Sequence, residues 1–128
     1  MLAAIRHLVV PGAVRSLAPL PSAQPHPVEH NGQLLNDPAS PYWGRYEGDE
    51  DTCRKPAYHN GTAWGWQLPF LSESIMRCWP GDEGALKAAR SYLLTMEPLL
   101  NSGCIGHFPE VMDGDAPHTQ RGCDAQAW

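Results

Sequence analysis

Apolar residues recur at helical spacing in the middle of the chain, between about residues 62 and 79. The stripe consists of Trp66, Phe70, Ile75 and Cys78. This spacing predicts an amphipathic helix, and Thr62 is in the right place to cap its first turn. Because Pro69 lies inside the stretch, we expect the helix either to begin near this proline or to be kinked there.

A second helical pattern begins after the break at Pro80-Gly81. Asp82 is the expected N-cap, because its side chain can accept a hydrogen bond from the first turn. The apolar face that follows consists of Ala85, Leu86, Ala89, Tyr92, Leu93 and Met96. The pattern ends at Glu97-Pro98, because the residue before a proline disfavours helical backbone. This segment is therefore predicted to be a regular helix with one buried side.

The other segments are rich in turn residues and show no period. Residues 1–57 contain eight of the 13 prolines, and Asn31-Gly32 and Asp37-Pro38 mark turns. Residues 101–124 also resemble a loop. Two helices and two long loops cannot enclose a core, because each apolar helix face must pack against another element. We therefore predict an all-α chain that is part of a larger helical fold, with half of an intertwined oligomer as the alternative.

Composition and charge exclude several classes of protein. Hydrophobic residues make up 42% of the chain and charged residues 18%, which is typical of globular rather than disordered chains. The net charge is −5, whereas nucleic-acid and anionic membrane surfaces need clustered Lys and Arg. No apolar run approaches the roughly 20 residues of a membrane span. We therefore expect no nucleic-acid partner and no membrane association.

Two observations concern the cellular location. The first 28 residues contain Arg6 and Arg15 but no acidic residue, a composition that can mimic a transit peptide. The apolar pieces in this segment are too short and too interrupted for a secretory signal. The four cysteines are too few for a disulfide-dense scaffold of this length. The sequence therefore predicts a cytoplasmic protein with reduced thiols.

Three segments combine indoles, neutral hydrogen-bonding side chains and carboxylates. They are residues 58–66, residues 106–115 and residues 121–128. This is the chemistry of a carbohydrate site: sugar rings stack on Trp, their hydroxyls pair with Asn, Gln or His, and hydrolysis needs two carboxyl groups. Taken singly, each segment also fits ordinary structure, as buried Trp, a turn at residues 59–61 and a surface turn at residues 113–115.

The order of these motifs resembles the C-terminal catalytic domain of glycogen debranching enzymes, the amylo-alpha-1,6-glucosidase domain. The matching patterns are Tyr-His-Asn-Gly-Thr-x-Trp from Tyr58, Pro-Glu-x-x-Asp-Gly from Pro109, and Gly-Cys-x-Ala-Gln-Ala-Trp from Gly122. Residues 10–17 and 44–49 also resemble the sequence that precedes the first motif in this family. The resemblance therefore spans nearly the whole chain.

The resemblance implies a fold, an activity and a set of site residues. The fold would be the C-terminal part of an (α/α)6 toroid with long irregular loops. The activity would be inverting hydrolysis of α-1,6-linked glucose at branch points of glycogen or another branched α-glucan, with no cofactor and no metal. Glu110 matches the general base. The residues that match the sugar pocket are His59, Asn60, Thr62, Trp64, Gln126 and Trp128.

The chain departs from the family pattern at the general acid. In the family this residue is an Asp in a motif well upstream of the first one, and Asp37, Asp49 and Asp51 do not lie in such a motif. Residues 1–128 therefore look like part of the domain, with residues 1–57 mostly loop and residues 58–128 helical and motif-bearing. Because one such group contributes about 10²–10⁴-fold to the rate, we expect the chain to be inactive without a complementing chain or a longer parent protein.

Two other functions are consistent with the sequence. A non-catalytic glucan-binding remnant would retain the tryptophans and bind sugar without cleaving it. A small zinc-binding module would use Cys104-x2-His107 and His118-x4-Cys123, supplemented by Cys53 and His59, because this spacing suits tetrahedral zinc. Short Cys/His pairs are common false positives, so we prefer the hydrolase interpretation.

Overall fold

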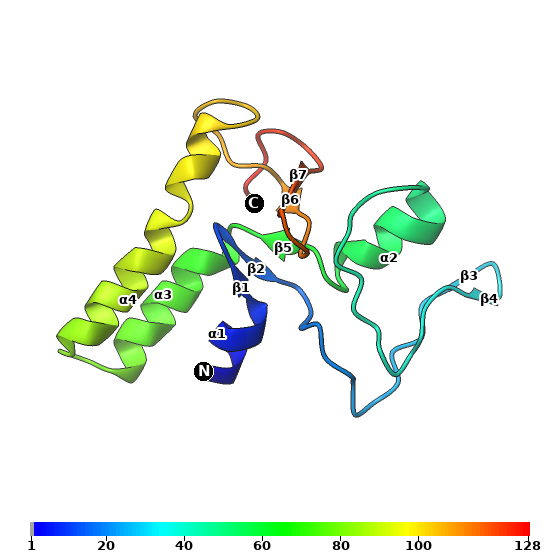
Figure 1. Ribbon diagram of the computed structural model, residues 1–128, viewed down its shortest axis with the longest axis horizontal. Coiled ribbons are helices and arrows are strands. Elements are labelled where there is room, and N and C mark those ends of the chain that lie inside the picture. Colours follow the sequence, from blue (N-terminus) through cyan, green and yellow to red (C-terminus); the bar gives the residue numbers. More distant parts are fainter. Residues whose placement is uncertain (1) are drawn as a thin grey trace.

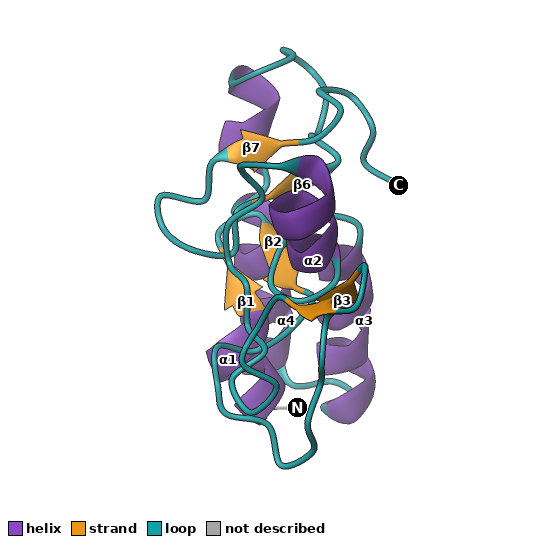
Figure 2. Ribbon diagram, turned by 90° about the vertical axis from the view of Figure 1, so that its right-hand side faces the viewer, coloured by secondary structure: helices purple, strands orange, loops and turns teal. Residues whose placement is uncertain are grey.

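A computed structural model describes residues 2–128 of the chain (Figure 1). The helices are α1 (Leu2–Leu8), α2 (Lys55–Tyr58), α3 (Gln67–Cys78) and α4 (Glu83–Leu94), with a π-helical segment η1 (Glu50–Arg54) and a 3-10 segment η2 (Glu97–Asn101). The strands are β1 (Val9–Val10), β2 (Ala13–Arg15), β3 (Glu29–His30), β4 (Gln33–Leu34), β5 (Ala63–Trp64), β6 (Val111–Met112) and β7 (Gln120–Arg121). Figure 2 shows that loops and turns make up much of the chain between these short elements.

The prediction of an all-α fold, and with it the toroid, is wrong. The described residues form a mixed α/β structure that is 35% helical and 12% strand, with a five-stranded antiparallel sheet. Each strand has only two or three residues, so no alternation of apolar and polar positions is long enough to be seen in the sequence. The strand partners are also far apart along the chain, and local patterns contain no information about such pairing.

The sheet joins segments from three parts of the chain. Its strand order is β1-β2-β5-β6-β7, so β5 lies in the centre. Ala63 of β5 pairs with Arg15 of β2 on one side and with Met112 of β6 on the other. The separate β3–β4 hairpin projects away from this sheet (Figure 1). The central pairing therefore places the residues around Tyr58 next to those around Glu110.

Helix α3 begins later than predicted. Its N-cap position is Trp66 rather than Thr62, because Ala63 and Trp64 pair with β2 and β6 instead of joining the helix. Pro69 lies in the first turn of α3, where its missing N–H group leaves no hydrogen bond unmade. The structure thus confirms the alternative in which the helix begins near this proline.

Helix α4 confirms the predicted helix and its N-cap but not the full extent of its buried face: Ala89 is buried, whereas Leu86 and Leu93 are 44% and 39% exposed. The Asp82 side chain accepts a hydrogen bond of 2.7 Å from the backbone N–H of Ala85 and caps the helix. Helices α3 and α4 pack along one another (Figure 1), and the buried Ser72 hydroxyl donates across the pair to the carbonyl of Ala89. Within residues 2–128, no helix has both the length and the apolar character needed to cross a membrane.

The core is small and lies at the sheet. Val10, Ala13, Ala63 and Met112 form its buried cluster, and Leu99 packs against them. The turn between β1 and β2 is tied to the end of α4, because the Gly12 N–H donates to the Thr95 hydroxyl at 2.9 Å. The helices are thereby held against the sheet through both apolar packing and a long-range hydrogen bond.

Two glycines allow the motif segments to touch through their backbones. A Cβ atom at Gly114 would overlap the carbonyl oxygen of Gly61, and one at Gly61 would overlap the carbonyl oxygen of Trp43. Neither glycine has a positive φ, so the requirement is space rather than backbone conformation. Gly114 therefore permits the close approach of the two motif segments, and Gly61 permits the approach of its segment to the backbone of Trp43 and Gly44.

Replacing Gly114 by Ala should destabilise the fold by roughly 3 kcal/mol, because the added methyl group meets backbone that cannot move aside. Gly65→Ala is the matched control, since a Cβ atom there would be 3.6 Å from its nearest neighbours. Urea unfolding monitored by circular dichroism measures both. Equal midpoints for the two variants would contradict the close-approach account.

Candidate functional site

Glu110 is held by hydrogen bonds to both carboxylate oxygens. The Tyr58 hydroxyl, at the end of α2, donates to Oε1, and the backbone N–H of Cys123 donates to Oε2 at 2.9 Å. The backbone of Glu110 also donates to the Cys123 carbonyl at 2.8 Å. Glu110 directly precedes β6, so the sheet pairing brings this carboxylate to Tyr58 across 52 residues of sequence.

The surroundings of Glu110 favour its ionised form. Burial raises the pKa of this carboxyl group, but the hydrogen bonds from Tyr58 and Cys123 outweigh it and hold the pKa below its ordinary value. Burial and the bond to Glu110 raise the pKa of the Tyr58 hydroxyl. At neutral pH the pair is therefore a carboxylate that accepts and a phenol that donates. An ionised carboxylate can act as a base or nucleophile but not as a proton donor.

An aromatic pocket of about 280 Å³ lies beside this carboxylate. Its lining residues are Ser16, Tyr58, His59, Trp64, Trp66, Gln67 and Trp128. Trp66 and Trp128 are 39% and 69% exposed, whereas Trp64 is only 5% exposed. The His59 ring stacks parallel to the Trp64 ring, with 5.8 Å between the ring centroids. The rings of Tyr58 and Trp128 contact the Trp64 ring edge-on. The open ring surfaces of the pocket therefore belong to Trp66 and Trp128, and Trp64 forms its inner wall.

Glu110 itself lines a second cavity of about 400 Å³, which we call the Glu110 pocket. Its other lining residues are Tyr46, Glu50, Lys55, Tyr58 and His59. Tyr58 and His59 line both cavities, so the aromatic pocket and the Glu110 pocket share a wall. A ligand in the aromatic pocket would thus lie across one side-chain layer from the carboxylate.

The structure brings together only some of the residues predicted for the sugar pocket. His59, Trp64 and Trp128 line the aromatic pocket. Gln126 is exposed and lines neither cavity.

The side chains of Asn60 and Thr62 form hydrogen bonds to backbone carbonyls at or just before the start of their motif. The Asn60 amide donates to the Pro56 carbonyl at 2.7 Å. The buried Thr62 hydroxyl donates to the Tyr58 carbonyl and accepts from the Trp64 indole. In this arrangement the two side chains hold the motif in shape and make no polar contact with the aromatic pocket.

Four residues of the aromatic pocket, Ser16, Tyr58, Trp66 and Gln67, were not among the predicted site residues. Tyr58 was quoted only as the first residue of its motif, and Trp66 was assigned to an apolar helix face. Ser16 lies in the segment of residues 10–17 that resembles the family but was given no role, and Gln67 lies in no motif. The sequence contains one signal for Trp66, because it is a second tryptophan two residues after Trp64. Neighbouring aromatic side chains at the start of a helix can face a pocket that is built by loops.

Asp113 is buried rather than part of a surface turn. Its side chain is 1% exposed and accepts hydrogen bonds from the Tyr46 N–H and from two nitrogens of Arg121, at 2.8 to 3.1 Å. Arg121 also pairs with Glu47 at 2.9 Å. Asp113 therefore joins the end of β6 to β7 and to the loop before η1, and it lines neither cavity.

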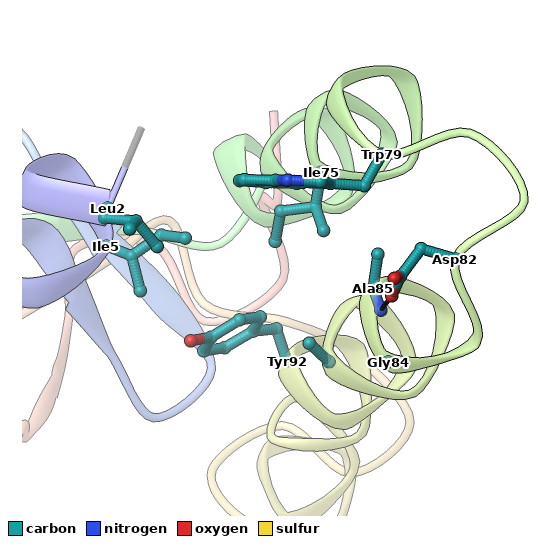
Figure 3. Close-up of a pocket in the computed structure, with 9 residues that line it drawn as sticks. Leu2, Ile5, Ile75, Trp79, Asp82, Gly84, Ala85 and Tyr92 are labelled. Carbon is teal, nitrogen blue, oxygen red and sulfur yellow. Dashed lines mark hydrogen bonds between the residues drawn. The ribbon is translucent and has the colours of Figure 1, made fainter.

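Two other features of the molecule do not add a site. Within residues 2–128, no three His, Cys, Asp or Glu side chains come together as a metal site, so the zinc hypothesis gains no support. A groove of about 330 Å³ lies between α1 and the α3–α4 pair (Figure 3). It is lined mainly by apolar side chains, among them Leu2, Ile75 and Tyr92, and by no residue of the three motifs.

Comparison with known proteins identifies one family. A family model described as amylo-alpha-1,6-glucosidase matches residues 33–128. The matched range contains Glu110 and every residue of the two cavities except Ser16. No curated protein and no solved structure matches the chain.

Glu110 should make the stability of the chain depend on pH below about 4.3, its ordinary unfolded pKa. The pKa of Glu110 is lowered in the folded protein. The stabilisation that ionised Glu110 gives to the fold is therefore fully present above its pKa in the unfolded chain, and it is lost as the pH falls through its pKa in the folded protein. The difference in unfolding free energy between wild type and Glu110→Gln should therefore be constant at neutral pH and shrink in acid. Urea unfolding from pH 3 to 7 measures it.

Glu73→Gln is the control, because it removes an exposed carboxylate from α3 that pairs only with Arg77. A difference between wild type and Glu110→Gln that stays constant down to pH 3 would show that the fold does not favour the ionised form of Glu110.

Proposed function

The chain belongs to the amylo-alpha-1,6-glucosidase family, and we propose that it forms part of a glycoside hydrolase domain acting on α-1,6-linked glucose at branch points of glycogen or a similar α-glucan. One observation supports this most directly. A carboxylate held in its ionised form lies one side-chain layer from a pocket with exposed indole rings. An aromatic sugar-sized cavity and one ionised carboxylate are two of the parts that glycoside hydrolysis requires, and the second carboxyl group is the third.

The aromatic pocket is proposed to hold a glucose ring. Its volume of about 280 Å³ suits a single sugar ring rather than a long chain. Trp66 and Trp128 offer open ring faces for the C–H faces of the sugar. Ser16, His59 and Gln67 line the same cavity and supply hydroxyl, imidazole and amide groups for the sugar hydroxyls. The pocket thus combines apolar faces with neutral polar groups, as sugar binding demands.

Glu110 is proposed to act as the general base. In inverting hydrolysis the base removes a proton from the water that attacks the anomeric carbon. A base must be ionised before it can do so, and the hydrogen bonds from Tyr58 and Cys123 favour that state. Each carboxylate oxygen has a further lone pair that can accept a hydrogen bond from a water in the Glu110 pocket.

The general acid is proposed to come from a complementing chain or from a longer parent protein. Among residues 2–128, Glu50 is the other carboxylate that lines the Glu110 pocket, and it pairs with Lys55 and Arg54 at 3.6 and 3.7 Å. Asp113 is buried against Arg121. Both carboxylates are already engaged by cations, so neither is placed to protonate a glycosidic oxygen.

A non-catalytic glucan-binding role is the second candidate. It is favoured by the same absence of an unpaired second carboxylate around the Glu110 pocket within the described residues. Under this alternative the aromatic pocket binds sugar as proposed and Glu110 only supports its wall. The two functions predict the same ligand and differ only in whether cleavage depends on Glu110.

Replacing Trp66 by Ala should weaken binding of a branched α-glucan by about tenfold, which corresponds to roughly 1.4 kcal/mol, because an open stacking face is lost. Trp79→Ala is the matched control: Trp79 is 40% exposed at the other end of the same helix, against 39% for Trp66, and lines the groove between α1 and α3–α4 instead. Affinity electrophoresis in glycogen measures both variants. Equal retardation of the two, or no retardation of the wild type, would contradict the proposed function.

A further inference from the structure

Tyr58 occupies the wall between the two cavities and contacts both. Its ring meets Trp64 edge-on at 4.7 Å on the side of the aromatic pocket and lies 5.6 Å from the Tyr46 ring on the side of the Glu110 pocket. Its hydroxyl donates to Glu110 Oε1. One side chain therefore lines the proposed sugar cavity with its ring and holds the carboxylate with its oxygen.

We propose that Tyr58 is the positioning residue for Glu110, fixing the plane of the carboxylate beside the aromatic pocket. The inference rests on the proposed role of Glu110 as a base, which it deepens. A carboxylate with one oxygen bonded can still rotate about its terminal bond. With Tyr58 on Oε1 and the Cys123 N–H on Oε2, that rotation would break a hydrogen bond in either direction.

The backbone around Tyr58 is held firmly enough for this task. The carbonyl of Tyr58 accepts a hydrogen bond of 2.7 Å from the buried Thr62 hydroxyl. Thr62 in turn accepts from the Trp64 indole at 3.1 Å. The position of the phenol is therefore set by the same motif that forms the inner wall of the aromatic pocket, and the geometry of the base depends on that wall.

The direction of the Tyr58–Glu110 hydrogen bond is fixed by the chemistry of its partners. An ionised carboxylate can only accept, and a phenol can donate until it ionises near pH 10 or above. Other titratable groups that face Glu110 are Tyr46, Glu50, Lys55, His59 and Cys123. Among the side chains of the described residues, Tyr58 has the hydroxyl that donates to Glu110, whereas Tyr46 lines the same pocket and its ring contacts Tyr58 instead.

The test compares Tyr58→Phe with Tyr46→Phe on the whole chain. Both variants remove one phenolic hydroxyl from the wall of the Glu110 pocket and keep the ring. The pKa of Glu110 is followed by NMR on protein labelled with ¹³C at the glutamate side-chain carboxyl, with Glu110→Gln assigning the resonance. We expect the pKa of Glu110 to rise in Tyr58→Phe and to stay at the wild-type value in Tyr46→Phe. Equal pKa values in all three proteins would overturn the inference.

A reciprocal measurement does not depend on the folding of Tyr58→Phe. In protein labelled with ¹³C at the tyrosine ring carbon that bears the hydroxyl, Glu110→Gln should shift the Tyr58 resonance and leave that of Tyr92 unchanged. An unmoved Tyr58 resonance would also overturn the inference. Neither experiment requires sugar binding, so a failure here is distinct from a failure of the wild-type chain to bind glucan.

Discussion

The pairing of Ala63 with Met112 in the centre of the sheet is the constraint on which the site depends. It joins β5 to β6, and the contact of Gly61 with Gly114 lets their backbones approach at the adjoining turn. Tyr58 lies five residues before Ala63, and Glu110 lies two residues before Met112. The hydrogen bond between these side chains is therefore a consequence of strand register. A change that opens this pairing would separate the aromatic pocket from its carboxylate.

The two charged carboxylates of the Pro-Glu-x-x-Asp-Gly motif have different tasks. Asp113 is buried and bonded to Arg121 and to the backbone of Tyr46, so it holds the loops around the sheet. Glu110 is held by a phenol and a backbone N–H rather than by a cation. This leaves its charge available to the adjacent pocket. Hydrogen bonds therefore keep Glu110 ionised without the neutralising partner that Asp113 has.

The sequence was sufficient to predict features that depend on local pattern. Helix α4 and its cap at Asp82 follow from a clear period and a known capping residue. The roles of Glu110, His59, Trp64 and Trp128 were predicted through motif order rather than through geometry, and they stay predictions, although the last three line the aromatic pocket. The sheet could not be predicted, because its strands are two or three residues long and pair across the chain. The position of Trp66 depends on where α3 begins, which the pairing of Ala63 and Trp64 decides.

The central claim is that the pocket beside Glu110 binds an α-1,6-linked glucoside. The most direct measurement is ¹⁵N NMR of the five tryptophan indole N–H groups during titration with isomaltose. The account predicts that the Trp66 and Trp128 resonances shift with a single dissociation constant while that of Trp79 stays in place. No shift at Trp66 and Trp128, or a shift confined to Trp79, would contradict it.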